Sequence, residues 1–235
     1  MRSLSSSSTA AATARVRGDV AEYTSQYING AWVASANGRD ALIDVHDSNT
    51  GRVFARAPRG SAADTARAIE AAAEAFPAWA ATPLTERVAA LERVLAEFES
   101  RKGAVGRALE RELGAPRGFA EKIQASTFSS HWKAALRLGQ PGAFPWREEM
   151  GDTVLVKEPI GVVGCITPWN WPLNQIACKI APAMLAGCTV VLKPSEITPV
   201  NAVLVAEVRI FLVWFPGISR LSPRPTLASL GRTRV

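Results

Sequence analysis

The stretch from residue 161 to residue 193 constrains the fold more than any other part of the chain. Gly161 to Ile166 is a short, continuous apolar run, the pattern of a strand buried on both faces. A helix is predicted over 172–186, and Thr189 to Leu192 reads as a second buried strand. Strand, helix and strand occupy about thirty residues, the size of one parallel βαβ unit. Such a unit predicts an α/β sheet that takes its ligand at the carboxyl ends of its strands.

The preceding residues predict a hairpin, short strands and long helices. Asn29-Gly30 lies between apolar residues, which is a strong hairpin signal. Strands are predicted over 42–45, 52–57 and 153–157. A first helix is expected to begin at Ser61, which starts a capping-box pattern, and to be interrupted at Pro77. A second is expected to begin with Thr82 as its N-cap and Pro83 as its first residue, and to carry an apolar face over 88–98. Two more are expected over 104–113, ended by Gly114, and over 119–138.

The distribution of charge argues against nucleic acid as a partner. The 235 residues carry 27 Lys and Arg against 21 Asp and Glu. Five of the basic residues, all Arg, lie after Val208, where there is no acid, so the first 208 residues hold 22 basic and 21 acidic residues. A nucleic-acid function would depend almost wholly on the tail. The longest apolar run near the end, 210–215, is far too short for a transmembrane helix of about 20 residues.

Cysteine usage indicates a reducing compartment, and we expect a cytoplasmic protein. The three Cys are odd in number and none has zinc-ligand spacing with another Cys or His, so no metal site is expected. Residues 1–18 are rich in Ser, Ala, Thr and Arg and contain no acid. That composition fits either a disordered extension, which we expect over 1–22, or an organelle transit peptide.

Polar side chains follow both buried strands. Asn170 offers a neutral N–H donor that could stabilise negative charge developing on a carbonyl oxygen. Lys193 offers a cation suited to ribose hydroxyls or phosphate, and Glu196 could pair with it or accept from a hydroxyl. Trp169 is a flat apolar surface for a ribose or a ring. The alternative is an ordinary polar loop, with Asn170 as a cap and a solvated Lys–Glu pair. Neither a GxGxxG nor a GxxxxGK[ST] phosphate loop is present.

The helix between the two strands carries two different stripes. One is apolar and is expected to pack on the sheet. The other mixes an aromatic ring, two amides and a thiol, and it either lines a substrate passage or forms a half-exposed helix face. The apolar stripe is Leu173, Ile176, Ile180 and Met184, and the mixed stripe is Trp171, Asn174, Gln175 and Cys178.

Two long motifs in this region resemble the signature of the aldehyde dehydrogenase superfamily. They are Glu158-Pro-Ile-Gly-Val-Val-Gly-Cys-Ile-Thr-Pro-Trp-Asn-Trp-Pro-Leu-Asn-Gln175 and, at the expected spacing, Ala186-Gly-Cys-Thr-Val-Val-Leu-Lys-Pro-Ser-Glu196. Tyr27-Ile-Asn-Gly-Ala-Trp32, Asn49-Thr-Gly51 and Ala75-Phe-Pro-Ala-Trp79 match as well. The resemblance runs from about Tyr27 to Val208 and implies the N-terminal portion of an aldehyde-dehydrogenase-like fold: α/β, with a partial Rossmann-like parallel sheet, an N-terminal β-hairpin and helices.

The resemblance also implies a reaction and its residues. In the family, a cysteine thiolate attacks an aldehyde, hydride passes to NAD(P)+, and a glutamate activates the water that releases the acid. By position, Asn170 is similar to the family's oxyanion-hole side chain, and Lys179 to a lysine that assists proton transfer. The nicotinamide cofactor would be contacted by Ile166, Thr167, Pro168 and Trp169. Its adenosine ribose or phosphate would be held by Lys193, Ser195 and Glu196, with NAD expected and NADP the alternative. The aldehyde tunnel would be lined by Trp171, Asn174, Gln175 and Cys178.

The chain departs from that family pattern in its second half. The family's nucleophilic Cys, general-base Glu and Gly-rich cofactor turn lie downstream of the position of Lys193, and none of the three Cys here stands in a nucleophile context. We therefore expect 23–208 to be an incomplete cofactor-binding region without turnover. Residues 209–235 read either as frameshifted sequence or as a basic tail for a partner. A noncatalytic cofactor-binding or subunit-interaction fragment is the alternative function. The strand at 153–157 resembles the family's oligomerisation segment, whose partner strands we expect to be missing.

Overall fold

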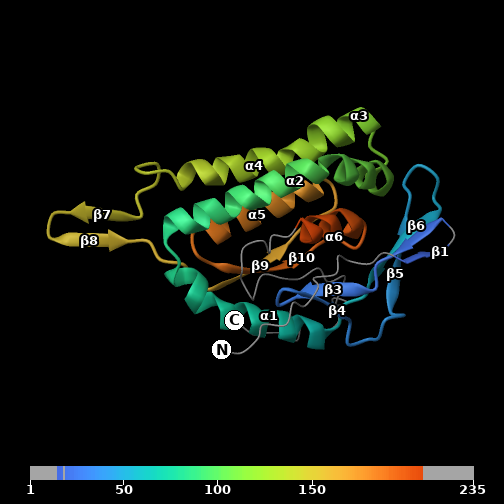
Figure 1. Ribbon diagram of the computed structural model, residues 1–235, viewed down its shortest axis with the longest axis horizontal. Helices are drawn as coiled ribbons and strands as arrows, with labels where there is room; N and C mark the ends of the chain where they lie inside the picture. Colours follow the sequence, from blue (N-terminus) through green and yellow to red (C-terminus); the bar gives the residue numbers. More distant parts are fainter. Residues whose placement is uncertain (1–14, 18, 209–235) are drawn as a thin grey trace, which may run out of the picture.

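The computed structural model describes residues 15–17 and 19–208. Helices α2, α4 and α5 form the upper layer of the molecule, and the β9–β10 pair lies between α5 and α1 (Figure 1). The helices are α1 Ala62–Ala81, α2 Leu84–Leu113, α3 Arg117–Phe119, the π-helical turn η1 Ala120–Gln124, α4 Ala125–Leu138, α5 Pro172–Leu185 and α6 Pro199–Glu207. The strands are β1 Arg15–Arg17, β2 Val20–Glu22, β3 Ser25–Ile28, β4 Ala31–Ala34, β5 Leu42–His46, β6 Val53–Pro58, β7 Arg147–Met150, β8 Thr153–Val156, β9 Val162–Ile166 and β10 Thr189–Lys193.

The predicted βαβ unit is confirmed. Strands β9 and β10 pair in parallel, with Val162 opposite Thr189 and Ile166 opposite Lys193, and α5 connects them. The prediction that β9 is buried on both faces is wrong. Cys165 is buried, but Gly164 and Ile166, which point to the opposite face of the strand, are exposed, because that face is left uncovered at the end of β9.

Helix α5 buries its apolar stripe as expected. Leu173, Ile176, Ile180 and Met184 are each at most 2% exposed. The helix packs on more than the sheet, since α5 contacts α2 and α4 as well as β9 and β10. Burying four large side chains from one helix contributes on the order of 1.5–3 kcal/mol for each. This packing holds α5 firmly behind the strand ends.

The N-terminal part forms two small sheets. The hairpin β3–β4 is as predicted, and its turn places Asn29 at φ 51° and Gly30 at φ 76°, left-handed angles that Asn and Gly tolerate best. The other sheet has the order β1-β2-β6-β5. Strands β1 and β2 correct the expectation of no regular structure up to residue 22. They are ordered because β2 pairs with β1 and also with β6; residues 1–14 lie outside the described part.

Two helix boundaries differ from the prediction. Pro77 does not interrupt α1, which continues to Ala81. Trp79, fully buried one turn from the helix end, outweighs the hydrogen bond that the missing N–H of Pro77 costs. Thr82 does not cap α2 either. Its hydroxyl donates to Ala78 O at 2.9 Å in the preceding helix, and α2 starts after Pro83 and runs unbroken to Leu113, where Gly114 (φ 66°) ends it as predicted.

The predicted helix over 119–138 contains a wider turn. Residues 120–124 form the π-helical turn η1, which packs against α2. Gly106 of α2 permits this close approach, because a Cβ there would lie 2.5 Å from Glu121 Cγ. A π turn changes which side chains point from the helix toward its neighbours.

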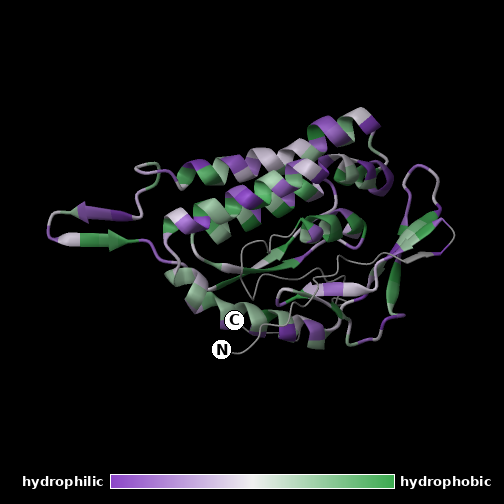
Figure 2. Ribbon diagram, in the orientation of Figure 1, coloured by the Kyte–Doolittle hydropathy of each residue, from purple (hydrophilic) through white to green (hydrophobic). Residues whose placement is uncertain are grey.

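The β7–β8 hairpin projects from the body (Figure 1). The strand predicted at 153–157 is β8, and β7 pairs with it antiparallel. Among the described residues the other edge of β8 has no paired strand. The strand β8 is apolar (Figure 2), yet Val154, Leu155 and Val156 are 43–51% exposed. Over 15–17 and 19–208, no helix has the length and apolar character needed to cross a membrane. The Arg-containing tail at 209–235 lies outside the described residues.

Candidate functional site

The carboxyl ends of β9 and β10 meet at one edge of the sheet. Ile166 and Lys193 are register partners, and the Thr167 backbone N–H donates to Lys193 O at 3.1 Å. This bond extends the parallel ladder by one step, so the loop after β9 and the loop after β10 begin side by side. The two predicted groups of cofactor residues are therefore adjacent in space.

The loop after β9 presents a mostly exposed surface. Ile166 is 72% exposed and Trp169 50%, which is unusual for large apolar side chains without a ligand or partner. Pro168 is exposed as well, whereas Thr167 is buried and contributes backbone only. The Asn170 side chain is exposed and has no hydrogen-bond partner among the described residues, so its amide N–H groups are available to a ligand.

The loop after β10 is partly self-paired. Lys193 Nζ lies 3.6 Å from Glu196 Oε2, and both side chains remain about a quarter to a third exposed (25% and 32%). A single ion pair of this length, with both side chains in contact with solvent, is worth about 0–1 kcal/mol, so a ligand can replace it at little cost. Ser195 is buried, and its hydroxyl accepts a hydrogen bond from Ile197 N at 3.2 Å. Ser195 thus shapes the loop more than it faces solvent.

The mixed stripe of α5 lies under the neighbouring helices. All four of its side chains are half-buried. The Trp171 ring meets the Phe119 ring edge-on at 5.8 Å, and Asn174 Nδ2 lies 2.9 Å from His131 Nε2. Sequence reasoning missed Phe119 and His131. It placed both on a helix over 119–138, but the face they share appears only once the π turn and the packing of α4 on α5 are known.

Lys179 is tied to its own helix. Its Nζ donates to Gln175 Oε1 at 2.8 Å and lies 3.4 Å from Gln175 O. The Cys178 thiol lies 3.6 Å from the same carbonyl. The structure therefore brings Lys179, Gln175 and Cys178 together one turn apart, next to the Asn174–His131 pair.

Two of the three cysteines, Cys165 and Cys188, are buried as structural residues are. Burial raises the pKa of the Cys165 thiol to about 11, with a nearby Lys179 lowering it and Cys178 raising it. Cys188 is 5% exposed and lies just before β10. A thiol that stays protonated at neutral pH is a poor nucleophile.

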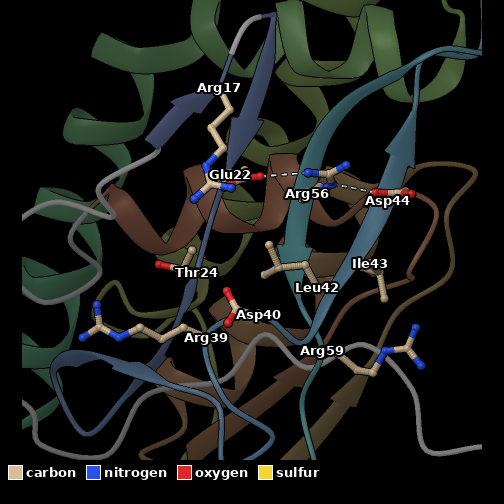
Figure 3. A pocket seen from close by; sticks show the side chains of 10 residues that line it. All are labelled: Arg17, Glu22, Thr24, Arg39, Asp40, Leu42, Ile43, Asp44, Arg56 and Arg59. Atoms are coloured by element: carbon tan, nitrogen blue, oxygen red, sulfur yellow. Dashed lines mark hydrogen bonds and ion pairs between the residues drawn. The ribbon is translucent and has the colours of Figure 1, made fainter.

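A separate pocket of about 720 Å³ opens on the β1-β2-β6-β5 sheet (Figure 3). Charged side chains cross this sheet in a row. Arg56 lies between Glu22 (2.9 Å) and Asp44 (2.8 Å), and Arg17 reaches Glu22 at 3.5 Å. In Figure 3, Arg39 and Arg59 point away from each other, so the cations do not converge on a common ligand position. None of the sequence-predicted site residues lines this pocket.

A parallel βαβ unit with aromatic and polar side chains at the ends of its strands is the arrangement found in nucleotide-binding α/β proteins. The family model described as "Aldehyde dehydrogenase family" matches residues 32–210. The chain belongs to the aldehyde dehydrogenase family.

Individual relatives and solved structures that resemble the chain are aldehyde dehydrogenases as well. A putative aldehyde dehydrogenase of Staphylococcus aureus (strain USA300) is 41% identical over 187 residues, which is 80% of this chain and 38% of that protein. An aldehyde dehydrogenase of Bartonella henselae is 36% identical with a TM-score of 0.81, covering 87% of this chain and 43% of that one. Aldehyde dehydrogenase C of Pseudomonas syringae, in a mutant structure with NAD+ and octanal, is 37% identical with a TM-score of 0.81, covering 86% and 41%. The chain thus spans about two fifths of the length of these relatives.

Proposed function

We propose that the chain forms the cofactor-binding part of an NAD(P)-dependent aldehyde dehydrogenase, an enzyme that oxidises an aldehyde to a carboxylic acid. The observation that carries the proposal is the meeting of the β9 and β10 ends, joined by the Thr167–Lys193 backbone hydrogen bond. A nucleotide cofactor needs one surface for its ring and another for its ribose, and these two loops offer both. The same P. syringae structure, with NAD+ and an aldehyde bound, supports the choice of ligands.

The residues fit this cofactor by their chemistry. Ile166 and Trp169 offer exposed apolar surface for the nicotinamide side, and Pro168 stiffens the loop between them. Lys193 donates to ribose hydroxyls while Glu196 accepts from them, because a ligand can displace their weak pair. A carboxylate at this place repels a 2′-phosphate, which favours NAD over NADP. The cofactor, when bound, accepts the hydride that leaves the aldehyde.

The aldehyde would lie beyond Asn170. The Asn170 Nδ2–H donates to the aldehyde oxygen as negative charge develops there, and it stays neutral at every working pH. The half-buried stripe of Trp171, Asn174, Gln175 and Cys178 lines the approach, and Lys179, held by its hydrogen bond to Gln175 Oε1 at 2.8 Å, is the proton-carrying group beside it.

These residues by themselves bind cofactor without turnover. The reaction needs a reactive thiolate, and the buried Cys165 (pKa about 11) and Cys188 do not supply one, while Cys178 belongs to the approach. This is the observation that favours the second candidate function, a noncatalytic cofactor-binding or subunit-interaction unit. The two candidates differ in whether further residues complete the enzyme.

We extend the proposal to the domain limits, partner and compartment. Residues 23–208 form the family region; strands β1 and β2 precede it, with β2 paired to β6, and the segment 209–235 follows it. The exposed β7–β8 hairpin joins copies of the chain, and the free thiols suit the cytoplasm.

The proposal is tested by calorimetric titration of the chain with NAD+ and NADP+. Lys193→Met should weaken NAD+ binding about tenfold, or ~1.4 kcal/mol. The matched control is Lys133→Met, an exposed lysine on α4, which should change affinity less than about twofold. Equal affinities in the chain and in Lys193→Met would remove the proposed ribose site.

A further inference from the structure

Helix α6 begins without a cap of its own. Its N-cap residue, Thr198, makes no side-chain capping bond, and the Thr198 hydroxyl is buried with no partner in the described part of the chain. Pro199 follows at the first helical position and has no N–H to satisfy. The first free backbone donors of the helix are therefore those of Val200 and Asn201.

A carboxylate 88 residues earlier takes up these donors. Glu112 Oε1 accepts from Val200 N at 2.6 Å, and Glu112 Oε2 accepts from Asn201 N at 3.2 Å and from Asn201 Nδ2 at 2.8 Å. The same Asn201 amide donates to Thr198 O at 2.8 Å. Glu112 thus caps α6 from a different helix, and it is 1% exposed.

The position of Glu112 on its own helix points to a role outside that helix. It lies in the last turn of α2, where the helix dipole disfavours a negative charge. The end of α2 is itself fixed: Ser48 N donates to Arg111 O at 2.8 Å and Asn49 Nδ2 donates to Glu110 O at 3.0 Å. Glu112 is therefore a rigid support for what it holds.

What it holds is the far end of the loop after β10. The near end is fixed where Thr167 N donates to Lys193 O, and the far end is fixed at Val200 and Asn201. Residues 194–199 connect the two fixed positions, Lys193 and Val200, and Glu196 is one of these connecting residues. A shift of α6 therefore moves Glu196 relative to Lys193.

We infer that Glu112 is a positioning residue for the nucleotide site: it anchors α6 so that the 193–198 loop presents Lys193 and Glu196 to the adenosine ribose. The inference rests on the proposed function for its ligand, but the anchoring itself is independent of any ligand. Three N–H donors converge on the carboxylate, so an amide at this place, which carries donors of its own, cannot satisfy all of them.

The test compares Glu112→Gln with Glu110→Gln, which removes the same charge from the same helix at a side chain outside the α6 contact. Amide hydrogen exchange of peptides covering 194–201 reports the anchor, and titration with NAD+ and with ADP-ribose reports the site. For Glu112→Gln we expect exchange over 194–201 to rise about tenfold and both affinities to fall about tenfold. Glu110→Gln should match the unsubstituted chain. Glu112→Asp, which keeps the carboxylate, should lose less than Glu112→Gln and serves if the latter fails to fold.

The results distinguish the anchoring of α6 by Glu112 from its effect on nucleotide binding. Unchanged exchange in 194–201 overturns the anchor, and raised exchange with unchanged nucleotide affinity shows a purely structural cap and overturns the positioning role. If the unsubstituted chain binds neither nucleotide, the proposed function fails and the positioning role fails with it, while the exchange arm still decides whether Glu112 holds the loop.

Discussion

At the scale of single residues, burial sets the reactivity of the three thiols. Burial raises the pKa of Cys165 to about 11, so its thiol stays protonated near neutral pH. Cys178 is half-buried on α5, and Cys188 is buried. In the native chain, iodoacetamide should therefore modify Cys178 well before the other two, as read by peptide mass spectrometry over time. Earlier modification of Cys165 would contradict the assignment of that thiol as structural.

Single residues also mark where sequence reasoning succeeds and fails. The exposure of Trp169 and Asn170 at a strand end follows from a local pattern, because the residues that create it are neighbours in sequence. Glu112 could not be found this way. Its partners are 88 and 89 residues away, and a lone Glu at the end of a predicted helix reads as a solvated side chain. The His131–Asn174 contact escaped for the same reason.

At the scale of elements, the carboxyl end of α2 carries a buried carboxyl group that stabilises the fold less when it is ionised than when it is protonated. Burial raises the pKa of Glu112 to about 7, against three hydrogen bonds that lower it. A raised carboxyl pKa means that the folded chain binds more protons than the unfolded one, so stability falls as pH rises from about 4.5 to about 7. Glu207 on α6 also has a raised pKa, and the pKa of Tyr23 is raised by burial and by both carboxylates.

Glu112→Gln should flatten that pH dependence. Between about pH 5 and pH 7 the free energy of unfolding of the unsubstituted chain should drop by about 2 kcal/mol more than that of the variant, as measured by urea denaturation. A residual slope is expected from Glu207. Glu110→Gln is the control, and identical slopes for the chain and Glu112→Gln would contradict the burial of a titrating carboxylate.

In the turn that covers the same end of α2, Asp47 gives the opposite pH dependence of stability. Asp47 Oδ2 accepts from Arg111 Nε at 2.8 Å, and this hydrogen bond lowers the pKa of Asp47. The stabilisation that this hydrogen bond gives the fold is present above the pKa of Asp47 in the unfolded chain, near 4. It is lost as the pH falls through the lower pKa of Asp47 in the folded chain. Asp47→Asn should cost about 1 kcal/mol at pH 7. The difference should vanish in acid; a constant difference from pH 7 to pH 2 would contradict the ion-pair origin.

Elements with strong local signals could be predicted, and their junctions could not. The β3–β4 turn and the β9–α5–β10 unit follow from Asn-Gly and from apolar periodicity. The continuation of α1 through Pro77 depends on the burial of Trp79, and the order of β1 and β2 depends on pairing with β6, both of which are tertiary effects. The π turn needs the space that Gly106 leaves on another helix.

At the scale of the whole molecule, the projecting hairpin is the clearest surface for self-association. Val154 and Val156 are 43% and 51% exposed on a strand whose outer edge is unpaired among the described residues. Val154→Glu with Val156→Lys should shift the chain toward lower mass in sedimentation velocity at matched concentration. The control is Ile69→Glu, an equally exposed apolar residue on α1. The same mass distribution for the chain and both variants would contradict a role for the hairpin in assembly.

On the function proposed above, the ends of β9 and β10 together bind a nucleotide cofactor. The most direct test is a calorimetric titration of the unsubstituted chain with NAD+. We predict saturable binding with a stoichiometry near one per chain, tighter than for NADP+. A titration without saturable heat, in a chain shown to be folded by its circular dichroism, would contradict the account.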